Sequence, residues 1–173
     1  MNEPQWLTEA REDIGVAEIK GIEHNPRVLR LWRDAHIPRV VDDETAWCAA
    51  AVGAWLERAL IRSTRAANAM SYKTWGLDVF ESGALAVPLG AILVKPRPGS
   101  DWMGHVTLAV GVTRDGLVCG LGGNQKDRVG IDTFDPKVFV AGRWPIERDA
   151  RDLKLLRRLP TLDIAKTRDL RES

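Results

Sequence analysis

The stretch 46–60, AWCAAAVGAWLERAL, is apolar on nearly every side until it reaches Glu57 and Arg58. A half-exposed helix carries one apolar stripe, so this pattern predicts a helix that is buried all round. Many of its residues are alanine or glycine, which lets a sheet or another helix come close. We therefore expect this segment to be the central helix of the fold, with Cys48 one or two residues inside its start.

Two amphipathic helices are predicted before the central one. The first covers about 6–14, where apolar residues recur at helical spacing and Gly15 can end the helix. The second starts at Asn25 and Pro26, because asparagine is a good helix cap and proline suits the first turn. A further helix is expected near 66–75.

The second half of the chain contains short β-rich runs separated by turn sequences such as Gly122-Gly123-Asn124 and Asp135-Pro136. Connections this short make neighbouring strands antiparallel. Helices first and strands second indicate an α+β fold, with the helices packed on an antiparallel β-meander. The expected strands are 90–94, 105–112, 117–121, 128–134 and 138–144.

Composition and charge exclude several classes of protein. The 173 residues are 45% hydrophobic and 28% charged, as in one globular domain, which we place at 1–147 with a charged, helical tail at 148–173. No run approaches the roughly 20 apolar residues of a membrane-spanning helix. A net charge of +1 is too small to attract the protein to nucleic acid through its overall electrostatic field. The N-terminus has acids where a secretory signal has a basic start, so we expect synthesis in the cytoplasm without a signal peptide. We also expect a monomer.

Cys48 has the position of a cysteine nucleophile. The start of a helix carries unpaired N–H groups and a partial positive charge, which stabilise a thiolate. Asp43 and Glu44 act in the opposite direction, because nearby carboxylates raise the pKa of a thiol, unless Asp43 or Thr45 caps the helix and Glu44 points toward substrate. A buried, inert cysteine is the alternative interpretation, and Cys119 fits that description in its apolar strand.

His105 and Asn124 extend this pattern. Apolar residues alternate from Val106 onward, so His105 points to the other face of its strand, where small residues would let the Cys48 helix pack. One hairpin later, the amide oxygen of Asn124 could accept the imidazole Nδ1–H and orient the ring. Taken singly, His105 is an ordinary residue at a strand start and Gly-Gly-Asn an ordinary turn. Together they predict a Cys-His-Asn site.

Two tryptophans flank this site in the sequence. Trp47 precedes Cys48, Trp102 lies just before His105, and both are expected to wall a substrate cleft. The three histidines lack the spacing of metal ligands, so we expect neither a metal nor a cofactor.

Three sequence blocks resemble the papain-like cell-wall peptidases of the CHAP and NlpC type, most of all a phage- and prophage-associated branch. They are DDETAWCAA at 42–50, GHV at 104–106 and LGGNQ at 121–125, within a matching segment of about 4–145. The chain departs from the pattern at Ala51, where an aromatic residue is expected, and in the tail beyond Glu147.

The resemblance implies a papain-like fold and a bacteriolytic, endolysin-like peptidoglycan hydrolase. Cys48 would be its nucleophile, His105 its base and Asn124 the orienting residue. Asp43 or Glu44 would bind ammonium groups of the peptide stems, unless they serve only as helix caps.

Such an enzyme acts on the cell wall, in the periplasm, after release through a holin-type partner or after injection as an antibacterial effector with an immunity protein. Two alternatives remain: a non-catalytic virion or wall-binding protein, and a cytosolic thiol enzyme that acts on another amide.

Overall fold

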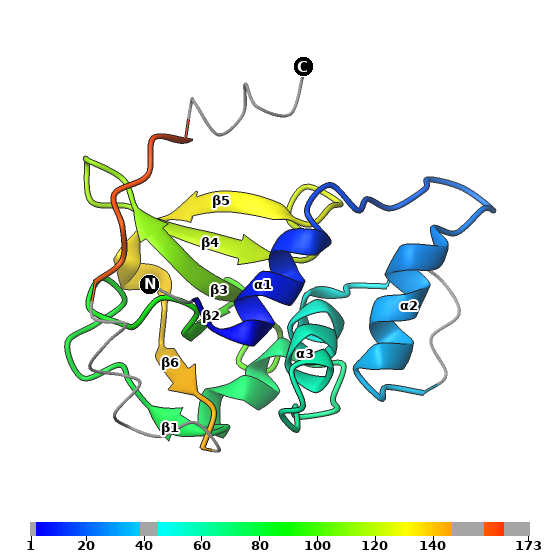
Figure 1. The fold of residues 1–173 in the computed structure, drawn as a ribbon, viewed down its shortest axis with the longest axis horizontal. Coiled ribbons are helices and arrows are strands. Elements are labelled where there is room, and N and C mark those ends of the chain that lie inside the picture. The colour runs from blue at the N-terminus through cyan, green and yellow to red at the C-terminus, as the bar shows by residue number, and fades with distance from the viewer. Residues whose placement is uncertain (1–2, 39–44, 147–157, 165–173) are drawn as a thin grey trace.

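The computed structural model describes residues 3–38, 45–146 and 158–164, and these ranges contain three α-helices and a six-stranded antiparallel sheet. The helices gather at one end of the molecule, and α3 lies between α2 and the strands (Figure 1). The predicted α+β class is therefore confirmed.

The helices follow the sequence pattern closely. The Asn25 side chain accepts the N–H of Arg27 and caps the second helix, as predicted. The third begins at Cys48, and Trp47 is its N-cap residue with no side-chain hydrogen bond, so the predicted cap Thr45 does not serve and Asp43 lies outside the described residues. Within the described ranges, no helix has the length and apolar character needed to cross a membrane. The helices are α1 (Gln5–Glu12), α2 (Pro26–Asp34), α3 (Cys48–Arg58) and the short 3-10 helices η1 (Ala69–Thr74) and η2 (Pro136–Val138).

The sheet has the order β1-β6-β2-β3-β4-β5. Its four consecutive strands β2 to β5 form the predicted antiparallel meander. The last strand does not continue it, because β6 returns to pair with β2, and Gly142 in β6 lies opposite Leu93. The strands are β1 (Leu77–Asp78), β2 (Ile92–Pro96), β3 (Gly104–Val112), β4 (Val118–Gly122), β5 (Gly130–Phe134) and β6 (Ala141–Trp144).

Residues 158–163 of the predicted helical tail are not helical, whereas Ile164 is. Residues 158–164 run beside the end of β3, where Val112 donates its N–H to Pro160 and accepts one from Leu162. A parallel bridge joins Val112 to Thr161. The remainder of the predicted tail lies outside the described residues.

Helix α3 is the centre of the core, as its composition predicts. All nine residues from Cys48 to Leu56 are buried. A Cβ placed on Gly53 would lie 3.0 Å from Ala35 Cβ and 3.3 Å from the Tyr72 hydroxyl, so α2 and η1 approach the helix closely there. The small residues of α3 thus allow dense packing on several sides.

The face of the sheet that α3 covers differs from the prediction. A Cβ on Gly123 would meet α3, whereas one on Gly122 would meet Thr107 and Gln125. Because successive strand residues point to opposite faces, Thr107 and α3 lie on opposite sides of the sheet. His105 shares the face of Thr107. The face of β3 that carries His105 and Thr107 therefore packs on parts of the chain other than α3.

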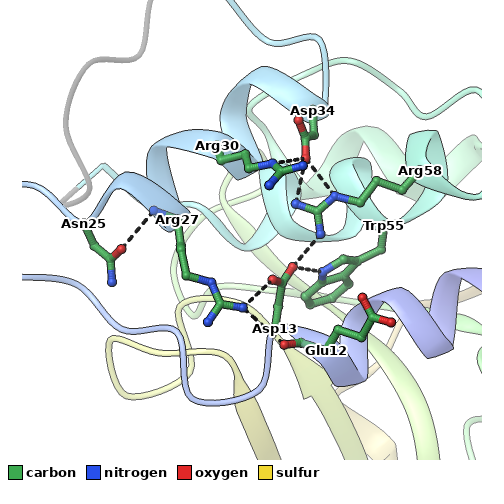
Figure 2. A network of polar contacts seen from close by, with 8 residues as sticks. All are labelled: Glu12, Asp13, Asn25, Arg27, Arg30, Asp34, Trp55 and Arg58. Carbon is green, nitrogen blue, oxygen red and sulfur yellow. Dashed lines mark hydrogen bonds and ion pairs between the residues drawn. The ribbon is translucent and has the colours of Figure 1, made fainter.

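A buried polar network joins the three α-helices (Figure 2). Asp13, directly after α1, is 7% exposed and accepts hydrogen bonds from Trp55 Nε1 at 2.9 Å, Arg58 Nη1 at 2.7 Å and Arg27 Nη2 at 3.2 Å. Arg58 also contacts Asp34 of α2 at 2.7 Å. The network fixes the position of α3 relative to α1 and α2 and, with it, the position of Cys48.

We predict that Asp13→Ala lowers the free energy of unfolding by about 2 kcal/mol, because the Trp55 N–H and one side of the Arg58 guanidinium lose their buried acceptor. Urea denaturation measures the change. Glu12→Ala, which removes an exposed carboxylate from the same turn, is the matched control and should change it by less than about 0.5 kcal/mol. Equal effects of the two substitutions would contradict a stabilising role for the network.

Candidate active site

Cys48 and His105 line one cavity of about 270 Å³ at the start of α3 and β3. Asn124 and Gln125, from the turn after β4, line it too. The fold therefore brings together the cysteine, the histidine and the LGGNQ turn that the sequence singled out.

Cys48 is the first residue of α3 and is 6% exposed. Burial raises the pKa of its thiol, and backbone N–H groups of Val106, Ala49 and Cys48 itself lower the pKa by less. The predicted effect of the helix start is present, but the expectation that it lowers the pKa of the thiol overall is wrong. Desolvation outweighs it, so Cys48 is a protonated thiol at neutral pH.

His105 is half-buried in β3, and its ring packs beside Phe134 with the centroids 6.0 Å apart. Burial lowers the pKa of His105, an effect opposed by its hydrogen bond with Gln125. The imidazole is therefore neutral at pH 7, and the resting site holds a neutral thiol and a neutral base.

Gln125 determines which ring nitrogen carries the proton. Its Nε2 donates to the carbonyl oxygens of Gly120 at 3.0 Å and Gly130 at 2.7 Å. Both amide hydrogens are thus used, and Oε1 faces His105 Nε2 at 2.9 Å as an acceptor. His105 must donate from Nε2 in this contact, which leaves the lone pair on Nδ1 free to accept a proton.

The orienting amide is therefore Gln125 rather than the predicted Asn124, and the bonded nitrogen is Nε2 rather than Nδ1. Asn124 lines the cavity and has a φ of 54°, the left-handed conformation that the turn interpretation anticipates. That turn directs the next side chain, Gln125, back under β4. Room for it comes from Gly122, where a Cβ would lie 2.5 Å from Gln125 Oε1.

The predicted substrate-binding residues have different outcomes. Trp47 is fully buried and donates its Nε1–H to Glu18 at 2.7 Å, so it supports the start of α3 and does not wall the cleft. Trp102 is 67% exposed and lines a second hollow that also reaches Cys48. Asp43 and Glu44 lie outside the described residues.

Two cationic residues of the cavity, Lys95 and Arg97, were missed from the sequence. The predicted strand 90–94 ends one residue before Lys95, whereas in the structure Lys95 pairs with His105 across β2 and β3. An antiparallel pairing extended by one residue would have pointed to Lys95.

No protein-family model and no curated protein matches this chain. The class of site is therefore defined by its geometry, in which a thiol at a helix start shares a cavity with an imidazole that a buried amide orients. A thiol, an imidazole and an amide that orients it are the kinds of group that a thiol hydrolase uses as nucleophile, base and orienting residue. Within the described residues, no cluster of three or more His, Cys, Asp or Glu side chains is placed to hold a metal ion.

We predict that alkylation of Cys48 by iodoacetamide has its acidic limb below pH 6.5, the ordinary imidazole pKa. Protonated His105 cannot accept the thiol proton, and because its pKa is lowered, the base stays neutral to a lower pH. In His105→Ala the rate at pH 7 should fall by about 100-fold, and the profile should move above pH 9, since the pKa of the thiol alone is raised. Mass spectrometry of the Cys48 peptide measures the rate, and an unchanged profile in His105→Ala would exclude His105 as the base.

We also predict that Gln125→Ala slows this alkylation at pH 7 by about tenfold, because the imidazole loses the acceptor that fixes its tautomer. Asn124→Gly is the matched control, since glycine suits the positive φ, and should leave the rate within about twofold. The reverse order of effects would restore Asn124 as the orienting residue. Circular dichroism of both variants establishes that each is folded.

Proposed function

We propose that the protein is a cysteine peptidase or amidase that cleaves amide bonds in the peptide stem or cross-bridge of peptidoglycan. The observation that carries the chemistry is the cavity shared by Cys48 and His105, with the imidazole held by Gln125. The substrate class is supported by the three sequence blocks that resemble papain-like cell-wall peptidases.

The same resemblance supports a papain-like fold for the chain. In that arrangement a thiol at a helix start lies against a sheet that carries the base and the orienting residue. Here α3 supplies Cys48, β3 supplies His105 and the turn after β4 supplies Gln125, in that chain order. The order and the α+β architecture agree with the proposal.

In the proposed reaction, His105 Nδ1 takes the Cys48 proton as Sγ attacks the amide carbonyl carbon. The resulting oxyanion accepts a hydrogen bond from the backbone N–H of Cys48 at the start of α3. The imidazolium then returns the proton to the leaving amine as the C–N bond breaks. Water, deprotonated by His105, hydrolyses the acyl thioester and regenerates the thiol.

The neutral resting pair favours this order of events. A buried thiolate and imidazolium would each lack solvation, so burial disfavours a preformed ion pair. Proton transfer accompanies attack on the substrate, and the negative charge passes directly to the carbonyl oxygen.

The proposal places the protein's action at the bacterial cell wall, after release from a cell or injection into one. An endolysin and an antibacterial effector would share this site and this chemistry. A non-catalytic wall-binding protein would have no use for the oriented imidazole.

We predict that Cys48→Ala abolishes the release of soluble fragments from purified sacculi, whereas Cys119→Ala, which alters the other buried thiol, retains it. Mass spectrometry of the fragments identifies the cleaved bond. Cleavage that persists in Cys48→Ala would refute the cysteine mechanism. If the wild-type protein releases no fragments from sacculi of several peptide-stem types, the wall is not its substrate.

A further inference from the structure

Two hollows meet at Cys48 and differ in character. The charged arm contains His105 and Gln125, and the apolar arm contains Trp102. Ala46, Cys48, Arg97 and Gly104 line both, so the two arms adjoin at Cys48. A substrate that extends on both sides of the bond attacked by Cys48 would have one arm for each side.

The charged arm carries a surplus of positive charge among the described residues. Lys126 and Asp132 neutralise one another, since Nζ lies 2.7 Å from Oδ1. Lys95 and Arg97 form no ion pair with any residue in the described ranges. Two cations thus face the cleft with no protein carboxylate from these ranges to balance them.

The backbone of both cationic residues is anchored by the sheet. Lys95 pairs with His105 across β2 and β3, and its Nζ lies 5.9 Å from the centroid of the Phe134 ring. Arg97 follows directly after β2, where its backbone N–H donates to Met103 at 2.8 Å. Both residues thus line the cavity that contains the imidazole.

The direction of the substrate follows from the proposed function, on which this inference rests. His105 returns its proton to the leaving amine, so that amine must lie on the imidazole side of Sγ, in the charged arm. The acyl portion then occupies the apolar arm beside Trp102.

We propose that Lys95 and Arg97 form a carboxylate subsite for the leaving group. The preferred substrates are then amides whose amine side is an amino acid or short peptide with a free carboxylate. Arginine binds a carboxylate through two parallel N–H donors, and lysine adds a point charge. This subsite would make the cleft select substrates by the charge of the amine that leaves when the bond is cleaved.

Alkylation of Cys48 by two reagents of equal shape but different charge tests the subsite without a natural substrate. The measured quantity is the ratio of the iodoacetate rate to the iodoacetamide rate, because the thiolate fraction cancels in this ratio. In the wild-type protein we expect the ratio to exceed that of the neutral thiol N-acetylcysteine amide by roughly fivefold at low ionic strength, and the excess to fall with added salt.

Lys95→Gln and Arg97→Gln should each lower the ratio toward that of the free thiol. Lys95→Arg, which keeps the charge, should retain it. Lys137→Gln, which removes an exposed cation in η2, is the matched control and should leave it unchanged. Far-ultraviolet circular dichroism shows whether each variant is folded.

A wild-type ratio no higher than that of the free thiol, or one unaffected by both neutral variants, would overturn the subsite. The release of fragments from sacculi is measured in a separate experiment and compared with the alkylation ratio. Release that depends on Cys48 without an iodoacetate preference leaves the proposed function standing and removes the subsite. A clear preference without release keeps the carboxylate subsite and shows that the wall is the wrong substrate.

Discussion

The Gln125 amide donates both of its hydrogens to backbone carbonyls, at Gly120 in β4 and Gly130 in β5, and its oxygen is left to face His105. The hydrogen bonding of the β4–β5 hairpin thus sets the tautomer of a side chain in β3. The arrangement depends on Gly122, because a side chain there would occupy the space of the amide. Gln125 therefore links the pairing of β4 with β5 to the position of the proton on the His105 ring.

Burial of α3 sets the second condition of the site. A helix start exposed to solvent would give Cys48 the full benefit of unpaired N–H groups, but nine consecutive residues from Cys48 to Leu56 are inside the core. Burial raises the pKa of the thiol and lowers the pKa of His105, and both effects favour the uncharged forms. Neither Cys48 nor His105 therefore carries a charge at rest, and in the proposed reaction the reactivity of the thiol depends on the position of the base.

The spacing of apolar residues predicted the elements that carry the site, because it shows directly that α3 is buried on all sides and that the side chains of β3 alternate between two faces. Cys48 and His105 followed from those elements. The pairing of β6 with β2 did not, since short connections suggest neighbours but do not determine the sheet order. Gln125 was missed as the orienting residue because the positive φ of Asn124 turns the Gln125 side chain inward in place of the Asn124 side chain. The position of Trp47 was predicted wrongly because a ring next to a nucleophile in the sequence can pack in the core as easily as it can line the cleft.

The cations of the charged arm connect substrate binding to the base. Lys95 and Arg97 lower the pKa of His105, because a positive charge nearby disfavours the imidazolium. A carboxylate bound between them would cancel that charge and raise the pKa of His105, which makes the imidazole a stronger base only while a substrate is present. The same binding removes the help that Arg97 gives to the thiolate. In the proposed reaction, proton transfer from Cys48 would then be driven by the strengthened base and by the carbonyl carbon that the thiol attacks, and without substrate both groups stay neutral.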